Sequence, residues 1–181
     1  EHIEISVLAS VIATIIGGLL GVFIYEYKRL AVPVMVVVNF LYTIPSISML
    51  GLLLYVSGVG NTTVIIALVI YALLPMVRNT FTGLNQIEES LCEAGIALGL
   101  TRIQRLWNIE IPLAMPTIMA GIRTMFVMTI ALTGIASFIG AGGLGVAIYR
   151  GITTNQSTLT IAGSLLIALL AITVDALFSL G

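Results

Sequence analysis

The sequence predicts an all-α integral membrane protein with five transmembrane helices. Of its 181 residues, 59% are hydrophobic and only 8% are charged, and the mean hydropathy is +1.18. A soluble domain carries about 25% charged residues, so this chain has too little polar surface for a water-exposed globule. The apolar residues form continuous runs, whereas the strands of a membrane barrel alternate apolar and polar residues. Without an internal repeat or linker, we expect one transmembrane domain over residues 1–181.

The positions of the five helices follow from the lengths of the apolar runs. About 20 apolar residues suffice to cross the hydrocarbon layer as a helix. The first run follows Glu1 and Glu4 rather than basic residues, which favours a retained helix over a signal peptide. The uncharged stretch 30–77 is too long for one crossing, and the turn residues SGVGNT at 57–62 divide it. A glycine-rich break at 140–156 separates the last two runs. We expect spans at about 5–25, 31–56, 63–84, 113–139 and 157–180.

The distribution of basic residues predicts the orientation. Alternate crossings put Lys28, Arg29, Arg102 and Arg105 on one side, while the opposite connections hold only Arg150. Cytoplasmic loops of membrane proteins are enriched in Lys and Arg. The N-terminus is therefore expected outside, and the polar insert at 85–112 is expected in the cytoplasm of a bacterial cell, below its inner membrane.

The polar insert at 85–112 is predicted to form two short helices. Asn85 and Glu88 have cap-like spacing before the first helix, and Thr101 and Gln104 match a capping box before the second. Gly99 lies between them, where a helix C-terminus favours a residue that can adopt a positive φ. The insert is thus expected to bend at Gly99.

The first of these helices has a shallow apolar stripe, and the second is expected to end at a proline. Leu91, Ala94, Gly95 and Leu98 recur at spacings of three and four, and the small residues allow another surface to approach closely. Pro112 is expected to stop the second helix at the membrane surface. On these residues alone, a docking site and a connector lying on lipid headgroups are equally favoured.

The spacing of the insert resembles the EAA loop of ABC-importer permeases, EAA-x3-G-x9-I-x-LP. The departures are Gly95 in place of the second alanine and Ile111 in place of the leucine. In that family the loop is the coupling element, seated in a groove of the cytoplasmic ATPase. By this resemblance, we expect the coupling residues here to be Glu93, Ala94, Gly95, Gly99, Leu100, Arg102, Ile109 and Pro112. Glu93, Arg102 and Arg105 would add charge pairs at the rim.

The resemblance extends through most of the chain and indicates a branch of the family. The segments NFLYTIPSISMLGLL, LPMVRNTFTGL, IPLAMPTIMAGIRT and SFIGAGGLGVAIYRGI are similar to osmoprotectant-importer permeases, which take up glycine betaine, choline and carnitine. Methionine-importer permeases share the five-span plan. The resemblance implies a type I importer permease that works as a pair, most simply a homodimer, with two ATPases and an external solute-binding protein or fused binding domain.

The sequence agrees with a permease whose ATP is hydrolysed by a partner subunit. It contains no G-x4-GK[ST] motif, and its single lysine, Lys28, follows no glycine-rich turn. We therefore expect a transport subunit that is not itself an enzyme and holds no cofactor, with ATP and magnesium bound by the partner ATPase. An aromatic cage suits a quaternary ammonium, but the only tryptophan, Trp107, lies in the insert. High-affinity recognition is thus assigned to the binding protein, and nothing suggests nucleic-acid binding.

Several polar residues within the spans are candidates for the transport pathway. Asn39, Tyr42, Ser46 and Met49 recur at helical spacing in the second span and could line a pore, with polar contacts between helices as an equal alternative. Arg123 lies about ten residues into the fourth span, where an unpaired charge is costly. It is a gate candidate, although a salt bridge between helices is the stronger interpretation because a fixed positive charge repels a cationic substrate.

Other ionisable and glycine-rich features are given structural interpretations. Arg78 and Asp175 fall near the cytoplasmic ends of spans, where snorkelling or pairing suffices. The G-x-G-x-x-G at 140–145 lacks the βαβ context of a dinucleotide site, so we expect a flexible or re-entrant external segment. His2 has no ligand-spaced partner, so no metal site is expected. Cys92 is expected to be a small buried filler.

Two rival functions stay open from the sequence. One is an importer permease for another small solute, such as an ergothioneine-type betaine or methionine, which the binding protein's cage would discriminate. The other is a membrane scaffold or a self-contained channel outside the ABC class. A channel would conduct in liposomes without ATP, whereas a permease would be inert without its ATPase.

Overall fold

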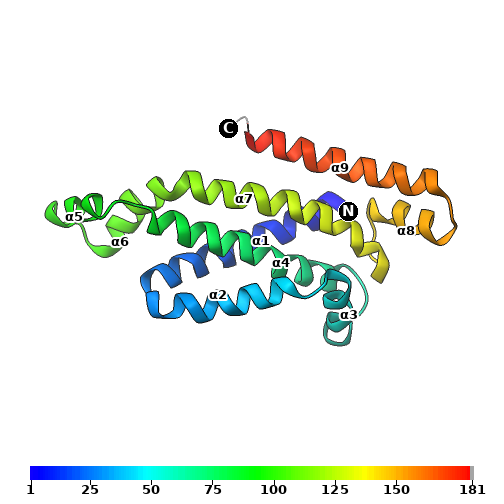
Figure 1. Ribbon diagram of the computed structural model, residues 1–181, viewed down its shortest axis with the longest axis horizontal. Helices are drawn as coiled ribbons and strands as arrows, with labels where there is room; N and C mark the ends of the chain where they lie inside the picture. The colour runs from blue at the N-terminus through cyan, green and yellow to red at the C-terminus, as the bar shows by residue number, and fades with distance from the viewer. Residues whose placement is uncertain (180–181) are drawn as a thin grey trace.

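The computed structural model describes residues 1–179, and this part of the chain is helical, with no strand (Figure 1). Its helices run in the order α1 (His2–Glu26), α2 (Lys28–Thr43), α3 (Ser46–Ser57), α4 (Asn61–Asn85), α5 (Glu89–Ala97), α6 (Arg102–Arg105), the π-helical turn η1 (Leu106–Glu110), α7 (Ile111–Thr133), the 3₁₀ segment η2 (Gly134–Ile139), α8 (Gly145–Thr153) and α9 (Ser157–Ser179).

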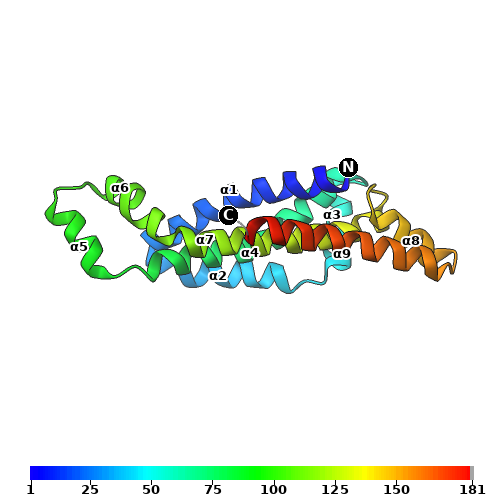
Figure 2. The same cartoon turned by 90° about the horizontal axis from the view of Figure 1, so that it is seen from above.

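The long helices form a bundle with α4 packed between α1 and α7, α2 on the outside of α4 and α9 against α7 (Figures 1 and 2). Glycines allow the central helices to approach closely. A Cβ at Gly21 of α1 would lie 2.5 Å from Cβ of Thr80 on α4, and a Cβ at Gly121 of α7 would lie 2.5 Å from Cβ of Asn79. A single methyl group at either position would force the backbones apart.

Four of the five expected spans match helices of the structure. The first, third and fifth correspond to α1, α4 and α9, and the fourth to α7 with η2. Each is long and apolar enough to cross a membrane. The expected end of the fifth span, at residue 180, lies outside the described residues.

The second expected span, 31–56, is not one helix. It is divided into α2 and α3, which meet at an angle of 100°. Pro45 causes the break, because proline lacks an N–H group and drives the preceding residue out of the helical conformation. Ile44 is extended, with φ −66° and ψ 127°, and its carbonyl accepts a hydrogen bond from the Tyr71 hydroxyl on α4. The fifth crossing therefore exists only as a bent pair.

The two ends of the bundle differ. At one end, which we call the loop end, α5 and α6 extend beyond the long helices; α3, η2, α8 and the N-terminus lie at the opposite end (Figures 1 and 2). There His2 is buried, and its Nε2 lies 3.1 Å from the Ile130 carbonyl oxygen. The expected glycine-rich segment is a tight turn, since Gly140 and Gly143 have φ values of +78° and +107°. Residues 1–179 contain no cluster of three or more potential metal ligands.

Candidate functional site

The candidate site is the polar insert at the loop end, which forms two helices joined at Gly99 as expected. Gly99 has a φ of +78° and directly follows the C-cap residue of α5. Its N–H donates to the Ile96 carbonyl at 2.9 Å, and the N–H of Leu100 donates to the Gly95 carbonyl at 3.1 Å. These two bonds form a Schellman motif, which terminates α5 and fixes the direction in which the chain leaves it.

The start of the second helix also follows the prediction. Thr101 accepts the N–H of Gln104, and the Gln104 side chain accepts the Thr101 N–H at 2.9 Å, which completes a capping box. The cap expected for the first helix is wrong. Asn85 is the last residue of α4, where its side chain donates to the Phe81 carbonyl, and α5 begins after Glu88 without a side-chain cap.

The second short helix does not end at Pro112, contrary to the prediction. It continues from α6 through η1 directly into α7, so that Arg102–Ile139 is one continuous helical stretch. Pro112 is the second residue of α7 and lies just after η1, where the N–H of Ile111 donates to the Leu106 carbonyl five residues back. Hydrogen bonds of this π-helical kind widen the turn and leave room for the proline ring. The backbone of the insert is therefore continuous with α7, without a break at the proline.

Packing inside the insert explains two residues of the expected coupling set. Gly95 is the buried residue of α5, and a Cβ there would lie 2.9 Å from Cδ1 of Ile109 on η1. Gly95 thus packs directly on η1, and an alanine in its place would require the terminal methyl group of Ile109 to shift. On the other side of α5, Glu93, Ala94 and Leu98 are exposed, and Leu98 is 80% exposed. The expected apolar stripe is consequently split between Gly95, which faces inward, and an exposed face.

Arg102 connects the insert to α1. Its Nε lies 3.0 Å from a carboxylate oxygen of Glu26, the last residue of α1, and its Nη2 bonds the other oxygen. Its Nη1 bonds the carboxylate of Glu110 on η1, and the guanidinium carbon lies 5.4 Å from the ring centroid of Tyr25. A bidentate arginine–carboxylate pair has a defined geometry as well as a favourable energy.

Glu110 is the buried centre of this cluster, with 0% of its side chain exposed. Besides the bond from Arg102, its Oε1 accepts a hydrogen bond from Nε of Arg105 at 2.8 Å and a weak one from the Cys92 thiol at 3.8 Å. Burial alone raises the carboxyl pKa, but the bonds from the two arginines outweigh it, and the pKa of Glu110 lies below its usual range. The carboxylate is therefore ionised at neutral pH.

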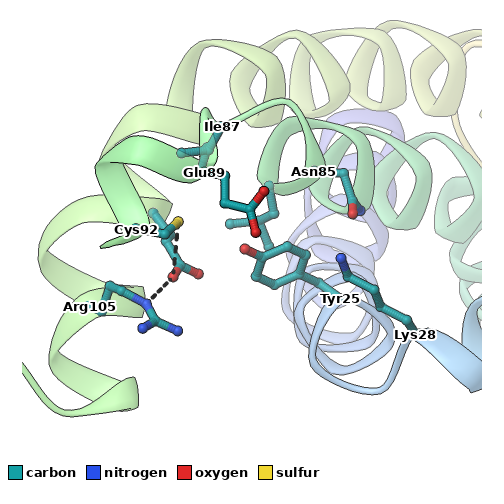
Figure 3. A pocket seen from close by; sticks show the side chains of 9 residues that line it. Tyr25, Lys28, Asn85, Ile87, Glu89, Cys92 and Arg105 are labelled. Carbon is teal, nitrogen blue, oxygen red and sulfur yellow. Dashed lines mark hydrogen bonds and ion pairs between the residues drawn. The ribbon is translucent and has the colours of Figure 1, made fainter. Parts of the chain in front are cut away.

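An open cavity of about 310 Å³ adjoins this cluster (Figure 3). Arg105 and Cys92 reach one side of it from the insert, while Tyr25 and Lys28 come from the junction of α1 and α2. Burial raises the pKa of the Cys92 thiol, which therefore stays protonated. The cavity lies at the junction where the insert, α1 and the end of α4 come together.

Glu26 and Glu110 were not singled out from the sequence. Arg102 and Arg105 were expected to add charge pairs at the rim of the docking surface, whereas within the chain both bind Glu110, and Arg102 also binds Glu26. The spacing of Arg105 and Glu110 offered a clue, since residues five apart face each other across a π-helical turn. The bond to Glu26 joins residues 76 positions apart, and no local pattern predicts it.

The residues expected along the transport pathway lie on two helices rather than one. Asn39 and Tyr42 belong to α2, where Asn39 accepts a hydrogen bond from Arg78 at 2.9 Å and the Tyr42 hydroxyl lies 3.7 Å from the Met128 sulfur. Ser46 begins α3 beyond the bend, and Met49 is buried in the core. The expected single stripe is therefore divided by the bend, and a role in the pathway stays a prediction.

Arg123 forms an ion pair between helices, the stronger of its two interpretations. Its Nε lies 2.5 Å from Oδ1 of Asp175 on α9, and its Nη2 lies 2.7 Å from Oδ2. Both side chains are about 40% exposed in the isolated chain. The pair joins α7 to α9, and Asp175 is bonded to a specific partner instead of snorkelling.

The chain matches a family model and several known proteins. Residues 9–180 match the family model of the binding-protein-dependent transport system inner membrane component. The chain is 45% identical over 176 residues to the glycine betaine/carnitine/choline transport system permease protein OpuCD of Bacillus subtilis, covering 97% of this chain and 77% of that protein. It is 44% identical to the osmoprotectant import permease protein OsmW of Salmonella typhimurium, covering 97% and 84%.

A further relative and a solved structure extend the comparison. The ergothioneine transport permease/ergothioneine binding protein EgtU of Helicobacter pylori is 41% identical over 93% of this chain and 30% of its own length. The MetNI methionine ABC transporter in an inward-facing conformation superposes with a TM-score of 0.87 at 21% identity, covering 98% of this chain and 89% of that chain. The type I importer-permease fold is thereby confirmed.

These matches span nearly the whole chain, and the identities to the three curated relatives named above exceed 40%. The protein is a multi-pass component of the inner membrane and a transport subunit rather than an enzyme. Its architecture and its sequence agree, and the chain belongs to the binding-protein-dependent inner-membrane permeases of ABC importers.

Proposed function

We propose that this permease imports osmoprotectants of the betaine class and that its insert at 85–112 docks on the ATPase. The observation that carries the docking is the exposed face of α5, with Glu93, Ala94 and Leu98, which extends beyond the bundle at the loop end (Figure 1). The Schellman turn and the capping box make the loop rigid. One relative named for glycine betaine, carnitine and choline and another named for osmoprotectants support the substrate class.

The proposed assembly contains two copies of this chain, two ATPase subunits and an external solute-binding protein. One chain of this size provides a thin wall, and a pore between two copies gives the substrate a protein-lined route. The loop end faces the cytoplasm and the N-terminus lies outside. ATP and magnesium bind to the ATPase, and ATP-driven approach of the two loops alternates access to the pore.

The pathway is proposed to run beside α2 and α3. Asn39 and Tyr42 would contribute polar groups from α2, and Ser46 from the first turn of α3. Met49, buried in the isolated chain, would support the wall rather than touch the substrate. The ion pair of Arg123 would hold α9 in place while these helices move.

Substitution of the exposed face tests the docking. We expect Ala94→Arg to abolish co-purification of the ATPase, because a long charged side chain on the exposed face of α5 prevents close approach without disturbing the loop itself. Gln156→Arg, which is exposed at the opposite end, is the control and should retain the ATPase. Equal retention by both variants would exclude this face as the docking surface.

An ergothioneine-type betaine is a second candidate substrate, favoured by the 41% identity to EgtU. Both candidates carry a trimethylammonium group and a carboxylate, and they differ in the imidazole-2-thione ring. Uptake of each radiolabelled compound into proteoliposomes with ATPase and binding protein, challenged by an excess of the other unlabelled compound, separates them. Uptake of ergothioneine that excess glycine betaine does not lower would support the second candidate.

A further inference from the structure

The side-chain bonds of Arg102 provide a route for mechanical force from the insert to α1. The backbone provides no such route, because it leads from the insert into α7. The backbone of the insert packs on itself and on η1, which continues into α7. Movement of the docked loop is therefore passed to α7 directly. Helix α1 is joined to the loop through side chains instead, by the two bonds between Arg102 and Glu26 and by the stacking of Arg102 on Tyr25.

The guanidinium of Arg102 has bonding partners on two sides, one on α1 and one on η1. Glu26 and Tyr25 are at the end of α1, and the guanidinium of Arg102 lies between them and the fully buried Glu110. Arg105 occupies the same carboxylate oxygen of Glu110, so the charge of Glu110 does not depend on Arg102 alone. Arg102 therefore connects the insert to α1 through its bonds to Glu26.

Helix α1 extends from this bridge to the opposite end of the bundle. It is one unbroken helix of 25 residues, about 37 Å long, without an internal proline. At its other end, His2 lies 3.1 Å from the Ile130 carbonyl oxygen, and the Ser6 hydroxyl lies 2.8 Å from that of Thr133, both on α7 near η2. A displacement of Glu26 along the helix therefore reaches the segment that precedes the glycine-rich turn.

We propose that Glu26 and Arg102 form a bridge that transmits the movement of the ATPase-docking loop to α1, and that this bridge sets how much substrate is moved per ATP hydrolysed. The inference rests on the proposed docking of the loop and assigns Glu26 as a positioning residue. Glu26 does not contact the exposed face of α5, so its loss should leave ATPase binding intact. The loss of Glu26 should instead reduce the transfer of force from the loop to α1.

The experiment compares Glu26→Gln with Glu4→Gln in the complete complex of permease, ATPase and binding protein in proteoliposomes. Glu4 lies on the same helix, α1, at the end away from the insert, and its side chain is 82% exposed, so the control removes a carboxylate from α1 without touching the bridge or the docking face. Glycine betaine uptake and ATP hydrolysis are measured on the same vesicles. Their ratio does not depend on the amount of complex, so a variant that is merely less stable leaves it unchanged.

We expect Glu26→Gln to retain the ATPase and to lower uptake per ATP about two- to fivefold, the effect of losing one partly exposed ion pair. Glu4→Gln should match the wild type. Arg102→Lys should also lower the ratio, and the double variant should be no worse than the more affected single variant, because both act through one bridge.

An unchanged ratio in Glu26→Gln, or losses that add in the double variant, would overturn the bridge. Failure of the proposed function looks different, because the wild-type permease itself would then neither retain the ATPase nor take up glycine betaine. A ratio that falls equally in Glu4→Gln would also count against the bridge, since the effect would then follow from any charge lost on α1.

Discussion

Gly99 determines the shape of the insert through its backbone alone. Its φ is +78°, and a Cβ added there would meet no other atom within 4 Å. Any loss on substitution is therefore conformational rather than steric, and the left-handed region costs an L-residue about 1–2 kcal/mol. The loop has few buried contacts with which to offset such a cost.

We expect Gly99→Ala to loosen the turn after α5 and to weaken association with the ATPase. Hydrogen exchange at the amides of Gly99 and Leu100 measures the loosening, and co-purification measures the association. The matched control is Gly51→Ala, since Gly51 also has open space around its Cβ but lies within α3 at a negative φ. If both variants exchange and associate alike, the positive φ is not what the loop requires.

Glu110 is the residue on which the charge cluster is centred. Removal of its carboxylate by Glu110→Ala would leave Arg102 and Arg105 without their shared partner, and breaking a buried ion pair costs about 3 kcal/mol. We expect a lower midpoint of thermal unfolding in detergent. Glu110→Gln, which keeps the shape and one acceptor oxygen, should lose less. A midpoint equal to that of Glu89→Gln in both variants would contradict this assignment.

At the scale of elements, proline has two different effects in this chain. Pro45 breaks the second span into α2 and α3, and the hydroxyl of Tyr71 compensates the carbonyl freed at Ile44. Pro112 leaves the helix continuous, because the wider π-helical turn of η1 precedes it. From the sequence, residues 31–56 were expected to be one span because of the length of the apolar run, and the second short helix was expected to end at Pro112.

The ion pair between α7 and α9 makes a prediction at the same scale. Asp175→Ala leaves Arg123 as a lone charge at membrane depth, and such a charge is costly unless it is paired or hydrated. We expect less folded permease in the membrane, measured by fluorescence-detected size exclusion of a tagged chain. The exchanged pair, Arg123→Asp with Asp175→Arg, should recover much of the loss. Recovery no better than that of Asp175→Ala alone would mean that the contact is not a stabilising pair.

For the whole molecule, the orientation can be tested at the two ends of the bundle. Tyr55 on α3 is 94% exposed, and Leu98, the C-cap residue of α5, is 80% exposed. In a Cys92→Ser background, we expect Tyr55→Cys to react with an impermeant maleimide in intact spheroplasts. Leu98→Cys should react only after permeabilisation. The opposite pattern would place the loop end outside and exclude docking on a cytoplasmic ATPase.

The sequence by itself determined the membrane class, the four unbroken spans, the bend at Gly99 and the capping box at Thr101. These features depend on composition, run length and the conformational preferences of single residues, which act over a few positions. The EAA-like spacing also singled out the insert as the proposed docking loop, since the residues that form its turn are close in the chain.

Only the tertiary structure decided the pairing of charges. Arg102 could have bonded to any acidic residue within reach, and the approach of α1 to the insert selected Glu26, while the π-helical turn brought Glu110 to both arginines. The same holds for Arg123 and Asp175, which are 52 residues apart. Long side chains on separate helices meet only once the backbones are packed, and packing depends on contacts such as Gly21 with Thr80 that leave no periodic pattern in the sequence.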